Sequence, residues 1–226
     1  MRSWSQWKSG ARRNMAIGAT TDQQITATTA IGRNQSKLTI AAWMRRPTSG
    51  SRQNCGFLTG NWHGLVHFSD NNIYFVFSPV AGNNNWGRCA ADITGWNHFA
   101  HVYDGTKTGN ARVEGYLNGT SSITLYSGTA PAATTVDNAN AEAFSIGRDS
   151  VNNTWSSGDF AEVAIWQEAL TAQDVNSLSK GFSPANVRPD SLKLYIPGVR
   201  NIIDYKANLT LTNTNTTVAN HPRVYA

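Results

Sequence analysis

The sequence predicts an all-β protein, a two-sheet antiparallel sandwich with one short helix near residues 172–180. Three observations predict this fold class. Apolar and polar residues alternate with a period of two over many short segments. Gly, Asn and Asp turn residues separate these segments. Charged residues make up only 15% of the 226-residue chain, and Asn, Thr, Ser and Gly, which favour strands and turns, take their place.

Two segments show the strand pattern most clearly. Residues 72–79 are apolar on both faces, which is typical of a strand that is covered from two sides. Residues 36–46 alternate, so that their side chains should divide between two faces: Leu38, Ile40 and Ala42 on one, Thr39, Ala41 and Trp43 on the other.

Further strands follow along the chain. Residues 96–105 and 111–120 end in Asp-Gly and Asn-Gly, which are strong turn signals. In the second segment, Val113 and Leu117 should share one face. Three more strands are expected at residues 142–149, 191–198 and 208–214. Together with residues 160–166 and the strand-like stretches around Cys55 and Cys89, the total is roughly ten, which favours two packed sheets.

The helix has clear start and stop signals. Thr171 is placed as the N-cap, and Asp174 lies at N3, where a negative charge suits the helix start. Leu170 before the cap can pack on Val175 in a hydrophobic staple. Gly181 supplies the C-terminal stop.

The strand before the helix carries acidic residues. Strict alternation would place Phe160, Glu162, Ala164 and Trp166 on one face. Asp159 and Glu162 are an odd number of positions apart and should project to opposite faces, so they are not expected to work as a catalytic pair. A pair assembled from distant strands, such as Glu114 with Glu162, stays open.

The chain divides into a basic N-terminal arm, residues 1–13, and one domain, residues 14–226. The arm holds four bases and no acid, whereas the remainder holds 15 bases and 14 acids. So few charges predict no specific nucleic-acid binding. No signal peptide or membrane-spanning segment is visible. The arm is either a solvated terminus, a first strand, or a docking element for a partner, formed by Arg2, Trp4, Trp7, Arg12 and Arg13.

Cysteine and histidine do not form a metal motif. Cys55 and Cys89 lie in strand-like stretches, so both a cross-strand disulfide and two buried free thiols remain open. Neither is spaced from another Cys or His as a zinc ligand would be. His98 and His101 should face opposite ways on one strand.

Three tryptophans are expected in loops beside asparagine or histidine. An exposed indole ring can stack on the apolar face of a sugar while amides bind its hydroxyl groups. The alternative is that each ring covers the edge of the core. The candidate glycan-binding residues are Trp62, His63, Asn85, Trp86, Asn153 and Trp155.

Residues 95–120, GWNHFAHVYDGTKTGNARVEGYLNGT, followed by FSIGRD and GDFAEVAIWQEALTAQDVNSL, resemble the motifs of LamG-like jelly-roll domains of the concanavalin A-like lectin/glucanase superfamily. The resemblance runs from about residue 38 to the C-terminus. It implies a jelly-roll sandwich of two curved sheets. Ala161 stands where the family motif has Asp, and Asn118 where many relatives have Asp. A calcium site is therefore disfavoured, and no cofactor is expected.

Glycosidases share this fold, and their laminarinase-like members carry a Glu-x-Asp-x-x-Glu strand. No Glu-x-Asp occurs in this sequence. The prediction is a non-enzymatic structural or recognition module. It resembles stand-alone chains on phage virions, as head decoration or tail-associated proteins, with other particle proteins, cell-surface glycans or further copies of itself as partners. The alternative is a free glycan-binding module; a glycoside hydrolase comes third.

Overall fold

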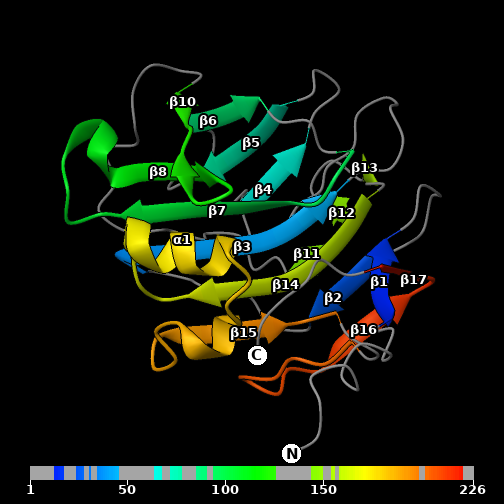
Figure 1. Cartoon of the computed structure of the whole chain (residues 1–226). Helices are drawn as coiled ribbons and strands as arrows, with labels where there is room; N and C mark the ends of the chain where they lie inside the picture. The colour runs from blue at the N-terminus through cyan, green and yellow to red at the C-terminus, as the bar shows by residue number, and fades with distance from the viewer. Residues whose placement is uncertain are drawn as a thin grey trace, which may run out of the picture.

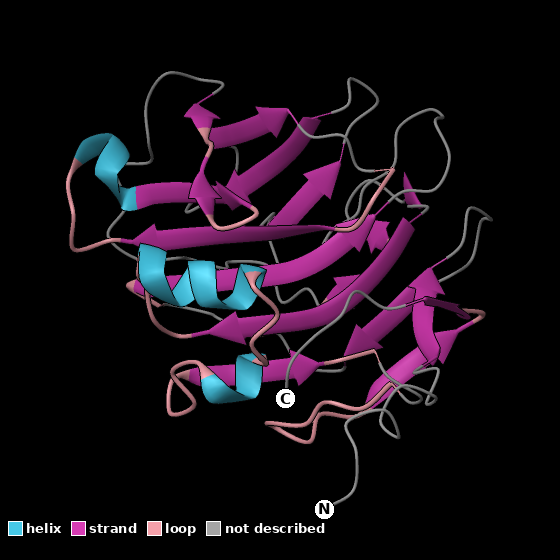
Figure 2. Ribbon diagram, viewed as in Figure 1, coloured by secondary structure: helices cyan, strands magenta, loops and turns pink. Residues whose placement is uncertain are grey.

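A computed structural model describes the backbone of residues 13–17, 24–27, 31, 35–45, 64–67, 72–77, 85–90, 94–125, 144–149, 154–155, 158–198 and 202–220 (Figure 1). Most of these residues are in strands, and the few helical turns lie on the outside of the sheets (Figure 2). The all-β prediction is confirmed. Among the described helices, none is long and apolar enough to cross a bilayer.

One layer of the sandwich is an eight-stranded antiparallel sheet, which we call the large sheet. Strand β15 (Leu192–Ile196) pairs with β14 beside the main path. Along that path the strands are ordered β17 (Thr217–Asn220), β1 (Arg13–Ile17), β14 (Gly158–Trp166), β3 (Lys37–Arg45), β7 (Asn97–Asp104), β8 (Val113–Leu117) and β9 (Thr120–Ser121).

The opposite layer is divided between two smaller sheets. The first has the order β10 (Thr124–Leu125), β6 (Asn85–Ala90), β5 (Asn72–Phe77), β4 (Gly64–His67). The second has the order β11 (Ser145–Ile146), β2 (Gln24–Ala27), β16 (Leu211–Thr214). A separate two-stranded ladder joins β12 (Arg148–Asp149) to β13 (Thr154–Trp155).

The main core lies between these layers. Ile40, Phe99 and Ile165 of the large sheet pack in one buried cluster with Ile25 and Phe75 of the smaller sheets. Leu38 and Ala42 belong to the same cluster, whereas Ala41 belongs to the cluster on the other face. The alternation expected for residues 36–46 is therefore confirmed. Full burial of a side chain such as Ile40 or Phe99 contributes roughly 1.5–3 kcal/mol to the free energy of folding.

Helix α1 (Ala172–Ser179) lies across β3 and β7 on the outer face of the large sheet (Figure 1). Ala41, Ala100 and Ala164 let the helix approach closely, and Val175 and Leu178 fill the contact. Two single turns, η2 (Gly109–Arg112) and η3 (Pro184–Asn186), complete the described helical segments.

The predicted helix signals are confirmed. Thr171 and Asp174 form a reciprocal capping box, in which the Thr171 hydroxyl accepts from the Asp174 amide and the Asp174 carboxylate accepts from the Thr171 amide. Leu170 and Val175 share the helix-side cluster. Gly181 has φ +93° and ends the helix, as a glycine after a helix commonly does.

The alternation expected for residues 160–166 is wrong. A β-bulge places two residues, Glu162 and Val163, opposite the single residue Ala42 of β3. Glu162 has φ +53°. Because the extra residue shifts the pleat, Phe160 and Val163 both face the main core. Glu162 instead lies on the outer face.

Two further expectations concerned a hairpin turn and the basic N-terminal arm. The Asn118-Gly119 turn is confirmed, with φ +51° and +83°, which is the pattern of the favoured two-residue hairpin. Arg13, the last residue of the expected arm, is already in β1, which pairs with both β14 and β17. The other arm residues, Arg2, Trp4, Trp7 and Arg12, lie outside the described residues.

Candidate functional site

The structure places only part of the predicted glycan-binding set. Trp62, His63 and Asn153 lie outside the described residues. Trp86 and Trp155 were expected in loops, and this is wrong for the backbone of both. Trp86 is in β6 opposite Val76, and Trp155 is in β13 opposite Arg148. Each is held in a ladder by backbone hydrogen bonds, which a count of neighbouring asparagines does not reveal. Asn85 is the first residue of β6.

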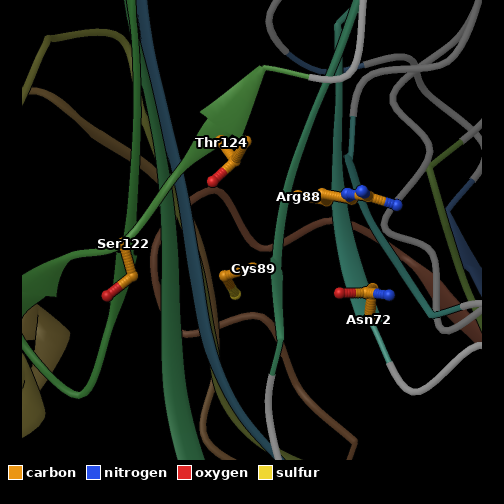
Figure 3. A pocket seen from close by; sticks show the side chains of 5 residues that line it. All are labelled: Asn72, Arg88, Cys89, Ser122 and Thr124. Carbon is orange, nitrogen blue, oxygen red and sulfur yellow. The ribbon is translucent and has the colours of Figure 1, made fainter.

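A hollow of about 290 Å³ lies at the β5, β6 and β10 strands, beside the β9–β10 connection. In Figure 3 the side chains of Asn72 and Arg88 extend the same way from neighbouring strands, whereas Ser122 and Thr124 extend toward the other side. The four polar groups therefore do not converge on one point. A small-molecule site needs convergent polar groups, so this hollow is a weaker candidate for a ligand-binding site than the group of side chains on the large sheet described below.

Cys89 lies in the wall of that hollow. It is a buried free thiol, and burial raises its pKa to about 12. A thiol with a pKa this high is protonated at neutral pH and is a poor nucleophile. Cys55 lies outside the described residues.

A second group of side chains lies on the outer face of the large sheet, beyond the part that α1 covers. It consists of Trp43 and Arg45 from β3, Trp96 and His98 at the start of β7, and Asp159 from β14; we call it the Trp43–Trp96 site. These strand ends lie to the right of α1 in Figure 1. Strand register brings them together, because Trp43 pairs with His98 and Arg45 pairs with Asp159.

An ion pair lies at the centre of the Trp43–Trp96 site. Arg45 Nε donates to Asp159 Oδ2 at 2.6 Å. The Asp159 side chain is 5% exposed and that of Arg45 is 26% exposed. Burial raises the pKa of Asp159, while the Arg45 guanidinium acts in the opposite direction by favouring the carboxylate. The guanidinium also lies 5.0 Å from the centre of the Trp96 ring, within cation–π range.

His98 is a buried member of this site, and its ring lies against the ring of Trp43. The two rings meet edge to face, with centroids 5.5 Å apart. Burial lowers the pKa of His98 to about 3, so the imidazole is neutral at physiological pH. In the described part of the chain its Nδ1 atom is buried and has no hydrogen-bond partner. His101 faces the main core instead and contacts Phe75, which confirms the opposite orientations expected for these histidines.

Asn118 fixes the start of β7 where it enters the site. Its side-chain oxygen accepts from the His98 amide at 2.9 Å, and its amide group donates to Asn97 Oδ1 at 2.8 Å. Asn118 therefore has a structural role in the hairpin.

The bulge brings a second carboxylate to the outer face. Glu162 Oε2 accepts a 2.6 Å hydrogen bond from the Tyr195 hydroxyl, and the Ser183 and Tyr195 hydroxyls lie 3.1 Å apart. The expectation that Asp159 and Glu162 project to opposite faces is therefore wrong. The two carboxylates are nevertheless engaged separately, Asp159 with Arg45 and Glu162 with Tyr195.

The other acidic candidate, Glu114, is also engaged. It pairs with Lys107 at 3.0 Å and accepts a short hydrogen bond from the Tyr116 hydroxyl. Within the described residues, no three His, Cys, Asp or Glu side chains are grouped as a metal site requires.

Sequence reasoning missed the Trp43–Trp96 site. The one local signal is that Trp43 and Arg45 have the same parity on their strand, which puts both on the outer face. Asp159 lies 114 residues from Arg45, so their contact depends on strand pairing that the sequence does not state.

The two layers, with one helix on the outer face of the large sheet, define a jelly-roll β-sandwich. The chain belongs to the concanavalin A-like lectin/glucanase superfamily, whose family model matches residues 18–176. Among curated protein sequences, none matches it.

Several solved structures share the fold. A Bacteroides ovatus protein thought to bind carbohydrate superposes with a TM-score of 0.70 and 18% identity over 95% of this chain; the chain spans 62% of that protein's length. A heptameric SAP-like pentraxin from Limulus polyphemus gives a TM-score of 0.59 and 16% identity, covering 93% of this chain and 96% of its own. The CBM40 module of a Ruminococcus gnavus sialidase, bound to α2,3-sialyllactose, gives 0.54 and 12%, covering 74% and 97%.

Proposed function

We propose that this protein is a non-catalytic recognition module that binds glycans through the Trp43–Trp96 site. The observation that carries the proposal is the Arg45–Asp159 ion pair, which lies beside two half-buried tryptophan rings on the outer face of the large sheet, outside the cluster that packs against α1. Indole rings offer a flat apolar surface to the C–H face of a sugar, and a guanidinium and a carboxylate offer donors and an acceptor to its hydroxyl groups.

The relatives support the same class of ligand. Two of the solved structures that share the fold are a protein thought to bind carbohydrate and a module bound to a sialylated sugar. Their identity to this chain is low, so the support they give concerns the fold on which such sites are built.

The proposed function does not include catalysis. A retaining glycosidase needs a nucleophile and an acid about 5 Å apart and free to act on the sugar. Here Asp159 is held by Arg45, Glu162 by Tyr195, and Glu114 by Lys107 and Tyr116. Incubation of the protein with any glycan that it binds should release no reducing sugar.

The test is a glycan array with the purified chain, repeated with calcium and with a chelator. We expect specific binding that the chelator leaves unchanged and that falls about tenfold or more in Trp43→Ala and in Trp96→Ala. Trp86→Ala and Trp155→Ala serve as the matched pair. If binding falls in these two and persists in the first two, the site belongs to the residues that the sequence singled out: Trp62, His63, Asn85, Trp86, Asn153 and Trp155. Absence of binding to any glycan contradicts the proposed function.

A second proposal concerns where the module is displayed. The basic arm, with Arg2, Trp4, Trp7, Arg12 and Arg13, supports docking on a larger particle such as a phage virion surface, as a head decoration or a tail-associated protein. Removal of residues 1–12 should abolish co-sedimentation with such particles and leave glycan binding intact. Co-sedimentation that survives this truncation would contradict a docking role for the arm.

A further inference from the structure

The polar groups of the Trp43–Trp96 site indicate which chemical groups of a sugar it would bind. Arg45 uses one of its nitrogens, Nε, on Asp159, and Asp159 uses one of its oxygens, Oδ2, in return. In the described part of the chain, neither the two terminal nitrogens of Arg45 nor Oδ1 of Asp159 has another hydrogen-bond partner. The site thus presents donors and an acceptor side by side.

A ligand must match both kinds of group. Oδ1 of Asp159 needs a donor, and the guanidinium nitrogens need an acceptor. A hydroxyl group is both donor and acceptor, so two adjacent hydroxyl groups on a sugar ring satisfy the pair together, one donating to Asp159 and its neighbour accepting from Arg45. A carboxylate or sulfate satisfies Arg45 alone, because it has no proton to donate, and it leaves Oδ1 without a partner.

The charges of the site also favour a neutral ligand. Arg45 and Asp159 together carry no net charge, and His98 beside them is neutral at physiological pH because burial opposes its protonation. Arg45 is the one charged group of the described chain that acts on Asp159. An anionic group on the ligand that approached Arg45 would therefore also meet the carboxylate of Asp159, and like charges in partial contact with water cost on the order of 1–4 kcal/mol.

We propose that the Trp43–Trp96 site recognises two adjacent hydroxyl groups of a neutral sugar residue stacked on tryptophan, and that it discriminates against a carboxylate or sulfate in that position. This inference rests on the proposed function, because it specifies the ligand of the same site. Specificity comes from the polar group that a wrong ligand leaves unpaired.

The test uses the whole chain and the glycan that binds most tightly on the array. Single-deoxy analogues of its terminal sugar are titrated by calorimetry. Loss of either of two adjacent hydroxyl groups should weaken binding at least tenfold, while loss of any other should change it less than threefold. The matching oligosaccharide with a uronic acid as its terminal sugar should bind more weakly than the neutral one.

A variant provides the second measurement. Asp159→Asn keeps the shape of the side chain and gives the site a net positive charge. We expect at least a tenfold loss for the neutral glycan and a gain for the acidic one, with Asp190→Asn, an exposed carboxylate, leaving both unchanged. Thermal unfolding checks that Asp159→Asn remains folded; the deoxy series needs no variant.

The outcomes separate the two proposals. Binding only to acidic or sulfated glycans leaves the proposed function standing and overturns the inference. Equal binding of every deoxy analogue also overturns it. Binding to no glycan overturns the proposed function, and the inference with it.

Discussion

The Tyr195 hydroxyl donates a 2.6 Å hydrogen bond to Oε2 of Glu162, and this contact exists because a β-bulge turns Glu162 away from the direction that its strand position implies. Glu162 is only 5% exposed and its backbone has φ +53°, a conformation that costs a residue with a side chain about 1 kcal/mol. Burial and the neighbouring carboxylate both raise the pKa of Tyr195. The phenol therefore stays protonated and remains a donor.

Removing that donor should destabilise the fold. Tyr195→Phe removes the Tyr195 hydrogen bond from a buried carboxylate, and we expect a loss of about 1.5–3 kcal/mol in the free energy of unfolding by urea. Tyr205→Phe makes the same chemical change on a ring that is 58% exposed and should cost less than about 0.5 kcal/mol. Equal losses in the two variants would show that the Glu162 contact contributes nothing.

Acid should destabilise the protein through His98. Its pKa is about 3 in the folded state and 6.5 in the unfolded chain, so the unfolded state binds more protons between these values. The stability that the neutral ring provides is complete above pH 6.5 and falls as pH drops toward 3. We expect a loss of about 2 kcal/mol between pH 8 and pH 5, a range in which carboxylates of ordinary pKa scarcely titrate.

The control for this prediction is His98→Gln, which has no charge to gain. The variant should be less stable at pH 8 but should show a flatter dependence of stability on pH over that range. A slope as steep as that of the unsubstituted protein would assign the acid sensitivity to another group.

Asp204 should be the most costly acid to remove from the described chain. It is fully buried, and its two oxygens accept from four backbone amides, those of Tyr195, Lys206, Ala207 and Leu209, at 3.0–3.2 Å. Asp204→Ala leaves all four without this acceptor, and we expect a loss of about 3 kcal/mol or more in urea unfolding. Asp204→Asn should lose less, because one oxygen remains. Asp190→Ala, at an exposed position, should stay within about 0.5 kcal/mol.

Gly119 should tolerate no side chain. A Cβ there would collide with Ser179 Oγ and would come within 2.9 Å of Asn176 Oδ1, and φ is +83°. Gly119→Ala should therefore cost about 2 kcal/mol or more, from strain and from displacement of α1. Gly109→Ala, with φ +55° but open space around it, should cost about 1 kcal/mol, and Gly95→Ala close to nothing. A Gly119→Ala loss no larger than that of Gly109→Ala would mean that the helix end yields without cost.

Much of this fold could be predicted from the sequence because its signals are local. The alternation of residues 36–46 predicted both faces of β3, and Asn118-Gly119 predicted its hairpin. Thr171 and Asp174 predicted the first turn of α1. In each case the deciding residues lie within a few positions of one another. The strand alternation, the turn geometry and the helix cap can therefore be inferred from neighbouring residues.

The candidate site could not be predicted in the same way. Whether Trp86 lies in a loop or in β6 depends on a pairing partner, Val76, which no turn signal indicates. The side of the sheet on which Glu162 lies depends on a bulge, and the bulge depends on how β14 registers against β3.

By itself, then, the sequence determined an antiparallel sandwich, the capped helix α1 and the superfamily to which the chain belongs. Only the tertiary structure decided that Trp43, Arg45, Trp96, His98 and Asp159 lie together on the outer face of the large sheet, beyond the part that α1 covers. The physical reason is that local periodicity fixes which way a side chain points within its own strand, whereas the register between strands far apart in the chain fixes which side chain stands beside it.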